Sequence, residues 1–584
     1  MRVKFLAGVF LFSIVVIAAR LFYWQVMDGD NLARAAASQR SLTRQIPAER
    51  GKILASDGKI LVGNESGYLL FASTVDLKDS PGSVAKLLAP IILASQTEDQ
   101  TGLDLPKDVE VPKLELKDLE KSLANKLATP DNYYIPLAHR LKQKYADQID
   151  ALKIFGLGLD PEPRRIYPEG SLLATTLGFV GAASSGEPQG YFGLEGFYNN
   201  ELAGRSGVER LERDAAGNPI LIGQIDTLPP QDGRTVTTSI DRYVQLVVEK
   251  HLREGVAKYG AKKGTAVVLD PKTGAVLASV TWPSFDPRGW QYFTKDFYKD
   301  GAVSETYEPG STFKVLGMAA GLDLGMVNPE TVCTECGGPF KVQGQEIHTW
   351  NNQYYPTGET MTKVLEHSNN VGMAWLATKI GKDKFYSYAK AFGVGEPTGV
   401  DIQGEEAGVF YQLKDIAPID LATMAFGQGF TTTALKILQI MSAVANGGVL
   451  TEPHVVTKLT DAGRDIPVQL AAPKQVIKPE TARVLTQMLA SAVEHGEARR
   501  LVPAGYRVAG KTGTAQVPVA GHYDPNKTVA SFVGFAPAED PKFAMIVKYD
   551  QPTTTPFGAT TAVPTFMDIT KELFGYFGVA PSTP

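Results

Sequence analysis

The stretch STFKVLGMAAGL, residues 311–322, is the most informative part of this chain of 584 residues. It follows Pro309 and Gly310, and this entry together with the apolar length predicts a buried helix. Ser311 is expected at the helix N-terminus, where backbone N–H groups and the helix dipole can stabilise an oxyanion. Lys314 lies on the same face one turn on, so a nucleophile and a base become neighbours. Taken alone, such a pair is more often a helix cap followed by a surface lysine.

A second polar peptide, SNN at residues 368–370, separates two stretches that are expected to be helical, 361–365 and 371–380. A loop or helix start here can present the Ser368 hydroxyl to relay a proton, while the Asn370 amide orients a lysine and a substrate amide. The alternative is that Ser368 only caps the second helix. A Ser-His pair with the preceding histidine is not expected, because side chains adjacent in sequence point apart on most backbones.

A third peptide, GKTGT at residues 510–514, belongs to a longer match to the phosphate-binding P-loop pattern, GYRVAGKT at 505–512. A P-loop needs a helix that begins at the lysine, so that backbone N–H groups meet the phosphates. Residues 511–517 instead read as a strand that continues up to a proline. The sequence therefore argues against an ATP-binding site.

If this peptide forms a strand beside the nucleophile, each of its residues can contribute to substrate binding. Gly513 lacks a side chain, so an extended peptide can pair with the strand edge. The hydroxyls of Thr512 and Thr514 can bind the terminal carboxylate of that peptide, and Lys511 supplies positive charge. The backbone N–H of Thr514 is expected to form the oxyanion hole together with that of Ser311.

Together, in this order, the three peptides resemble the signature of penicillin-binding proteins and serine β-lactamases. Over nearly its whole length the chain resembles the class B penicillin-binding proteins, membrane-anchored peptidoglycan D,D-transpeptidases. Glu308 before the Pro-Gly pair and SNNVG at 368–372 favour the septal, cell-division type; the elongation type is the alternative. Asn369 stands where many relatives have aspartate or another residue. Further matching peptides are RGKI (50–53), RIYP (165–168), GFVG (178–181), GLEG (193–196), DPKTGAVL (270–277) and GQG (427–429).

The resemblance implies a D,D-transpeptidase whose Ser311 is acylated by a stem peptide or a β-lactam and whose Lys314 takes the serine proton. Ser368 would help to protonate the departing D-alanine, Lys511 and Thr514 would position the terminal carboxylate, and an amine of a second stem would complete the cross-link. No cofactor and no metal are expected. A D,D-carboxypeptidase or β-lactamase-like hydrolase, and a non-catalytic division scaffold, are the alternatives from other classes. The sequence shows no obvious carboxylate for deacylation by water, and the intact trio counts against a scaffold.

The N-terminus is typical of a membrane anchor, because residues 5–19 are uncharged and almost wholly apolar. A helix over 5–24 would extend about 30 Å, which spans a bilayer. Arg2 and Lys4 before the span predict a cytoplasmic N-terminus, with the bulk of the chain outside the cytoplasm at the plasma (inner) membrane of a bacterium. A cleaved signal peptide is the alternative, but the aromatic continuation at 22–24 favours a retained anchor.

Composition agrees with a globular extracytoplasmic protein, since 43% of residues are hydrophobic and 21% are charged. A net charge of −5 without a long basic run argues against nucleic acid as a partner. Cys333 and Cys336 are half a zinc site at most; outside the cytoplasm they are compatible with a local disulfide, which the sequence leaves open. By resemblance, the partners would be peptidoglycan stem peptides, β-lactam antibiotics, a multi-spanning membrane glycosyltransferase and cell-division proteins.

Four segments are expected along the chain, and the fold class is α+β. Two hairpins, 265–281 and 529–549, together with the strand at 511 give five strands, so we expect a central antiparallel sheet that is covered by helices, among them 243–259 and 564–577. The pedestal is expected to be elongated and of the dimerisation-like kind, with an exposed stalk at 25–50 that is helical near 31–39. The segments are 1–24 (cytoplasmic tip and transmembrane anchor), 25–231 (non-catalytic pedestal), 232–577 (transpeptidase domain) and 578–584 (tail).

Overall fold

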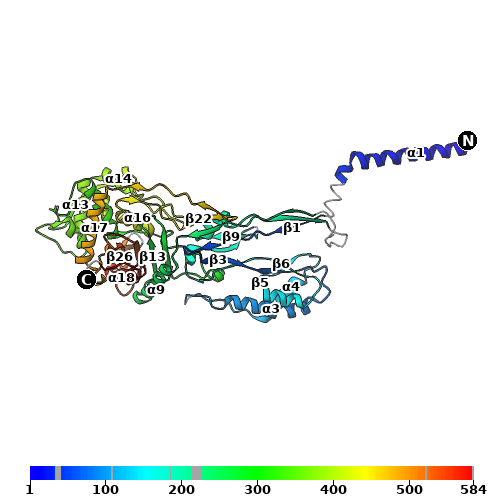
Figure 1. The fold of residues 1–584 in the computed structure, drawn as a ribbon, viewed down its shortest axis with the longest axis horizontal. Helices are drawn as coiled ribbons and strands as arrows, with labels where there is room; N and C mark the ends of the chain where they lie inside the picture. Colours follow the sequence, from blue (N-terminus) through cyan, green and yellow to red (C-terminus); the bar gives the residue numbers. More distant parts are fainter. Residues whose placement is uncertain (33–40, 107–108, 185, 213–224, 520–521, 582–584) are drawn as a thin grey trace. The chain divides into compact units, whose positions relative to one another are not determined.

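The computed structural model describes residues 1–584 except 33–40, 107–108, 185, 213–224, 520–521 and 582–584 (Figure 1). The described chain forms two compact units. The first consists of residues 1–50 and 203–233, and the second of residues 51–202 and 234–584. The second unit holds all three peptides that carry the expected chemistry.

The first unit begins with α1 (Arg2–Phe22), which continues as the π-helical turn η1 (Tyr23–Met27). A window of 18 residues in the combined helix has a mean hydropathy of 2.4 and no buried residue, so the helix is long and apolar enough to cross a membrane. The described residues of this unit also form an antiparallel sheet of β1 (Ser41–Ile46), β10 (Gly207–Glu212) and β11 (Ile225–Leu228). The strand β1, within the expected stalk at 25–50, was not predicted from the sequence. The helix expected near 31–39 lies almost entirely outside the described residues.

The second unit is built around a five-stranded antiparallel sheet whose order is β14-β13-β27-β26-β25. Both expected hairpins and the strand at Lys511 are present, which confirms the predicted central sheet. β25 lies at the edge of the sheet, with one side free of strand partners among the described residues. The strands are β13 (Lys263–Leu269), β14 (Val276–Trp282), β25 (Ala509–Val519), β26 (His522–Ala536) and β27 (Phe543–Asp550).

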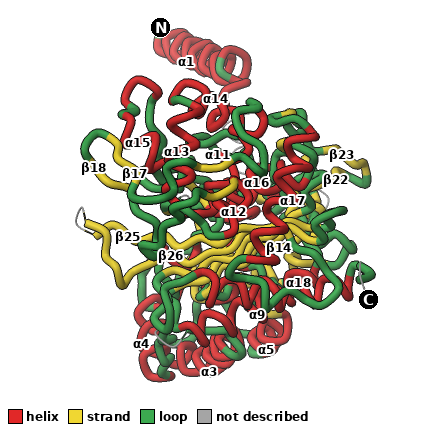
Figure 2. The backbone as a smooth tube through the Cα atoms, turned by 90° about the vertical axis from the view of Figure 1, so that its left-hand side faces the viewer, coloured by secondary structure: helices red, strands yellow, loops and turns green. Residues whose placement is uncertain are grey.

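Helices cover both faces of this sheet (Figure 2). The alternation in β27 shows why, because Met545 and Val547 face one apolar cluster while Ala544 and Ile546 face another. On the first face lie α9 (Arg242–Tyr259) and α18 (Ala562–Tyr576), which confirms the two expected helices. The other face is covered by α11 (Lys314–Asp323), α12 (Met361–Glu366), α13 (Asn370–Ile380), α14 (Lys382–Ala391), α15 (Pro418–Met424), α16 (Ala434–Ala445) and α17 (Pro479–His495).

A second sheet joins segments from before and after residue 231, in the order β23-β22-β12-β2-β3-β7. Near it, two of the family-like peptides meet, because Arg165 of RIYP donates from Nε to the buried carboxylate of Glu195 in GLEG at 2.7 Å. The domain boundary at 231/232 stays a prediction. The strands are β2 (Ile53–Leu54), β3 (Ile60–Glu65), β7 (Arg164–Ile166), β12 (Thr235–Thr238), β22 (Val456–Asp461) and β23 (Arg464–Pro467).

The remaining elements are a small α/β layer and short paired strands. The layer contains β4 (Gly67–Ala72), β5 (Ile135–Lys142), β6 (Leu157–Pro161), α3 (Pro81–Gln100), α4 (Leu116–Leu127) and α5 (Gln143–Ala151). The short elements are α6 (Ala174–Leu177), α7 (Gly193–Phe197), α8 (Asn199–Leu202), α10 (Lys295–Tyr298), and the strand pairs β8 (Phe179–Ala182) with β9 (Pro188–Tyr191), β15 (Thr306–Tyr307) with β20 (Thr432–Thr433), β16 (Val332–Cys333) with β19 (Glu359–Thr360), β17 (Phe340–Val342) with β18 (Gln345–Ile347) and β21 (Val449–Leu450) with β24 (Lys474–Gln475).

Candidate active site

Ser311 lies in a 3₁₀ turn, η3 (Gly310–Phe313), directly before α11 begins at Lys314. The turn is fixed from outside by the GQG peptide, because the Gly310 N–H donates to the Gly427 carbonyl at 3.0 Å. A Cβ on Gly427 would lie 2.1 Å from the Gly310 carbonyl oxygen, so only glycine permits this approach. The sequence predicted Ser311 at a helix N-terminus. The structure adds that the GQG peptide, from a separate loop, packs against this turn and fixes its position.

Lys314 is fully buried and points at the second peptide. Its Nζ donates to the Ser368 carbonyl at 2.6 Å, to Ser368 Oγ at 3.2 Å and to Asn370 Oδ1 at 2.7 Å. Burial lowers the pKa of Lys314 well below its ordinary value, and the charge of Lys511 lowers it further while Glu497 opposes the change. The fold thus makes the neutral form of this amine accessible, which a general base requires.

The Ser311 hydroxyl itself makes no hydrogen bond to Lys314 or Ser368 among the described residues, because Lys314 is engaged by the second peptide. In free enzymes catalytic hydrogen bonds are often long and form only with substrate in place. The roles predicted for Ser311 and Ser368 therefore stay predictions.

Ser368 is held in a left-handed conformation (φ +53°) between α12 and α13. The cap of α13 is Asn369, whose side chain accepts a hydrogen bond from the Gly372 N–H at 3.2 Å. The alternative that Ser368 only caps this helix is therefore wrong. Because Asn369 takes over the capping, the Ser368 hydroxyl is left to face Lys314.

A buried carboxylate that the sequence did not single out supports this loop. Glu359 accepts hydrogen bonds from Asn369 Nδ2 and from His367 Nδ1. Tyr355 stacks on His367 with the ring centroids 4.9 Å apart, so this histidine is held by packing and by its bond to Glu359. Glu359 pairs in β19 with Cys333 of β16, and Cys333 is joined to Cys336 by a disulfide. Nothing in the local sequence distinguishes Glu359 from other acidic residues of the loop.

Lys511 lies in β25, and no helix begins at this lysine, so the P-loop interpretation is excluded. Its Nζ is nearly buried and donates to Thr512 Oγ1 at 3.1 Å. Thr512 Oγ1 in turn donates to Glu497 at 3.2 Å. Burial lowers the pKa of Lys511 to about 8, with the Glu497 carboxylate opposing the shift. Glu497, which follows α17, is a second residue that sequence reasoning missed.

Gly513 allows β25 to lie against the nucleophile turn. A Cβ at this position would lie 2.5 Å from Ser531 Oγ and 2.8 Å from Thr312 Cγ2, both too close. The missing side chain therefore serves packing toward Ser311, in addition to the predicted access for a peptide. Thr514 is exposed, and its hydroxyl accepts from the Gly558 N–H at 3.1 Å. The oxyanion hole and the carboxylate site stay predictions.

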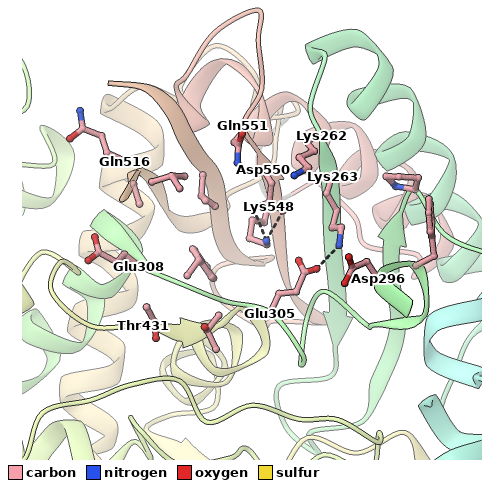
Figure 3. Close-up of a pocket in the computed structure, with 17 residues that line it drawn as sticks. Lys262, Lys263, Asp296, Glu305, Glu308, Thr431, Gln516, Lys548, Asp550 and Gln551 are labelled. Carbon is pink, nitrogen blue, oxygen red and sulfur yellow. Dashed lines mark hydrogen bonds and ion pairs between the residues drawn. The ribbon is translucent and has the colours of Figure 1, made fainter. Parts of the chain in front are cut away.

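A cavity of about 660 Å³ lies next to the first and third peptides (Figure 3). Its lining includes Glu308, three residues before Ser311, and Ala515 and Gln516, which follow GKTGT. Within the described ranges no group of three or more His, Cys, Asp or Glu residues is placed to hold a metal ion.

Two protein-family models match this chain and together cover most of it. The family described as "Penicillin binding protein transpeptidase domain" matches residues 264–571, and the "Penicillin-binding Protein dimerisation domain" matches residues 45–238. The chain is 33% identical to Stage V sporulation protein D of Bacillus subtilis, over 99% of this chain and 86% of that protein. It is 29% identical to the peptidoglycan D,D-transpeptidase FtsI of Escherichia coli K12, over 99% of this chain and 92% of that protein.

Solved structures share the fold. A peptidoglycan synthetase from Bifidobacterium adolescentis superposes with a TM-score of 0.72 and 26% identity, over 93% of this chain and 98% of the other. Penicillin Binding Protein 2X from Streptococcus thermophilus has a TM-score of 0.72 at 23% identity, over 93% of this chain and 81% of the other, which shows a common fold.

Proposed function

This chain belongs to the class B penicillin-binding proteins and is a peptidoglycan D,D-transpeptidase, and from this premise we propose that Ser311 is its nucleophile. One observation carries the proposal. A fully buried lysine, Lys314, lies one turn after Ser311 and is held by Ser368 and Asn370 in an environment that favours its neutral form. A serine is a poor nucleophile unless a neighbouring base takes its proton.

In the proposed acylation step, neutral Lys314 accepts the Ser311 proton while Oγ attacks the carbonyl of the penultimate D-alanine of a stem peptide. The N–H groups of Ser311 and Thr514 stabilise the oxyanion. Ser368, which lies 3.2 Å from Lys314 Nζ, passes a proton to the departing D-alanine amine. The terminal carboxylate of the donor binds to the ammonium of Lys511 and to the hydroxyls of Thr512 and Thr514.

In the second step, an amine of a neighbouring stem peptide attacks the acyl-enzyme and forms the cross-link, which releases Ser311. A β-lactam mimics the donor and acylates Ser311. Its opened ring stays attached to the acyl group, so nothing departs and the acceptor has no room to enter. The Ser311 ester is then expected to persist, because no acceptor amine can reach it. A hydrolase would instead release the acyl group to water.

We also propose the septal, cell-division role, supported by Glu308 and by SNNVG at 368–372. Residues 25–231 would act as a dimerisation-like pedestal and 232–577 as the transpeptidase domain. The N-terminus would lie in the cytoplasm, with a membrane glycosyltransferase and division proteins as partners. Depletion of the protein in its host should give filamentous cells; rounded cells would indicate the elongation type.

The nucleophile is tested by intact mass of the detergent-solubilised chain, wild type and Ser311→Ala, after incubation with a penicillin and again after hours of washing. A single persistent adduct on the wild type alone is expected. Rapid loss of the adduct with consumption of the drug would indicate a hydrolase. Absence of any adduct on a folded wild type would favour a non-catalytic scaffold.

A further inference from the structure

The cavity is lined at one side by Glu308, Ala515 and Gln516, which lie within a few residues of the first and third peptides, and at the other by charged groups. Figure 3 shows Glu308 and Gln516 on one side, and the pairs formed by Lys263 with Glu305 and by Lys548 with Asp550 on the other. Lys548 is buried and bonds Asp550 at 2.7 Å. A ligand in this cavity would therefore meet fixed charges beside apolar side chains such as Phe297 and Val529.

The acidic groups of this cavity differ in their partners. Glu305 and Asp550 are ion-paired as described, and Asp296 pairs with Lys299 at 3.0 Å. Glu308 is the exception: none of the described lysine, arginine or histidine side chains comes within 4.0 Å of its carboxylate. Its hydrogen-bond donors are neutral, the Gly429 N–H at 3.0 Å and the Tyr523 hydroxyl at 3.1 Å.

A half-buried carboxylate with only neutral donors favours a cationic ligand. Burial raises the pKa of Glu308, while the hydrogen bonds from Gly429 and Tyr523 oppose the rise. A second polar group points to a ligand independently. The Tyr307 hydroxyl is buried, belongs to the cavity lining and has no hydrogen-bond partner among the described residues.

Glu308 is fixed relative to the nucleophile by a single loop. Gly427 accepts a hydrogen bond from Gly310, next to Ser311, and Gly429 donates to Glu308. The carboxylate and the nucleophile turn therefore share one support. A cation held by Glu308 in the cavity would therefore be bound three residues before Ser311, the residue that is proposed to carry the acyl group.

We propose that this cavity is the acceptor subsite, and that Glu308 binds the side-chain ammonium of the second stem peptide. This inference rests on the proposed Ser311 acyl-enzyme. Glu308 accepts one proton from the ammonium, and the freed nitrogen lone pair forms a bond to the acyl carbon. The ester bond to Ser311 Oγ breaks, and the second nitrogen proton passes to Oγ by way of Lys314. The products are an amide, a free serine and a protonated Glu308, which returns its proton to water.

The amine could belong to the donor stem instead, since its own side chain carries the same group. An amine-free donor separates the two sources. The test uses the full chain in detergent, an acyl-D-alanyl thioester donor without any amine, and lysine or diaminopimelate as the acceptor. Transfer of the acyl group to the amine and its transfer to water are counted as two products by chromatography.

Glu308→Gln is the main variant, because an amide oxygen can still accept from Gly429 and Tyr523 while the charge is lost. We expect the ratio of aminolysis to hydrolysis to fall about ten- to a hundredfold, with a raised KM for the acceptor amine. Donor acylation, followed by release of the thiol, should change by less than about threefold. Tyr523→Phe is the matched control, because it removes one neutral donor and keeps the charge; it should keep most aminolysis. Glu308→Asp should restore part of the aminolysis lost in Glu308→Gln.

Two results would overturn the acceptor subsite. One is an unchanged product ratio in Glu308→Gln. The other is slower acylation of Glu308→Gln only when the donor carries an amine, which would assign Glu308 to the donor. Failure of the proposed nucleophile looks different, because the wild type itself would then form no acyl-enzyme with the thioester.

Discussion

At the residue scale, the proposed chemistry depends on two buried lysines with different surroundings. Lys314 has three oxygens of the second peptide around its amine, whereas Lys511 contacts Thr512 and lies near Glu497. Burial lowers the pKa of both; the charge of Lys511 lowers that of Lys314 further, and the pKa of Lys511 is about 8. Lys511 is therefore a cation below about pH 8, while the neutral form of Lys314 becomes accessible.

Replacing the base should abolish most acylation without unfolding the protein. Lys314→Met removes the amine but keeps much of the side-chain volume, so we expect the second-order rate constant for penicillin acylation to fall about 10²- to 10⁴-fold. The rate is measured with a fluorescent penicillin in gel or by polarisation. A thermal unfolding curve controls for folding. A folded Lys314→Met variant with an undiminished rate would show that another group takes the Ser311 proton.

The charge of Lys511 should set the alkaline limit of substrate binding. Because the pKa of Lys511 is lowered to about 8, its positive charge is present below this pH and is lost as the pH rises through it. The acylation rate constant should therefore decline above about pH 8. Lys511→Arg stays protonated throughout, so the decline should move upward by more than about one pH unit. An identical alkaline limb in wild type and Lys511→Arg would assign the titration to another group.

At the element scale, the site depends on how closely the edge strand β25 approaches the nucleophile turn η3. Gly513 is the point of contact, since a Cβ there would collide with Ser531 and Thr312. The GQG peptide at 427–429 presses on η3 from another side. The turn is thus held between two glycine contacts, and Ser311 is positioned by backbone packing.

Gly513→Ala should move β25 away from the turn, and we expect acylation to fall at least about tenfold, together with a lower unfolding temperature. Adding Ser531→Ala removes the closest of the two clashes and should recover part of the loss. Gly338→Ala is the control, because a Cβ at Gly338 meets no atom within 4 Å. Full activity of Gly513→Ala would mean that the turn tolerates displacement of the strand.

The elements that could be predicted are those with a local signal. β13, β14, β26 and β27 are apolar runs bounded by Pro, Gly and charged turn residues, and the helices of the second peptide start and stop at polar residues. β1 had no such signal, because its partner β10 lies far along the chain. The same reason hides Glu359 and Glu497, whose contacts to Asn369 and Thr512 exist only in the folded chain.

At the scale of the whole molecule, the order of the three motifs along the chain predicted the function better than the amino-acid composition did. Three peptides, at 311–314, 368–370 and 510–514, come together on one side of a sheet although long segments separate them. The sequence could not show that Lys548, which interrupts the apolar β27, would be buried and neutralised by Asp550. The cavity beside it follows from tertiary packing alone. The sequence singled out Glu308 as a mark of the septal type, but neither the cavity nor the absence of a cation near this carboxylate among the described residues had a sequence signal.

The most direct test of the central claim is to map where a penicillin attaches in the full chain. The acylated protein is digested with trypsin, and every peptide is searched by mass spectrometry for the adduct. We predict one adduct, on Ser311, in the peptide from Asp300 to Lys314 that follows Lys299. An adduct on Ser368, or on any residue outside this peptide, in an otherwise folded protein would contradict the assignment of Ser311 as the nucleophile.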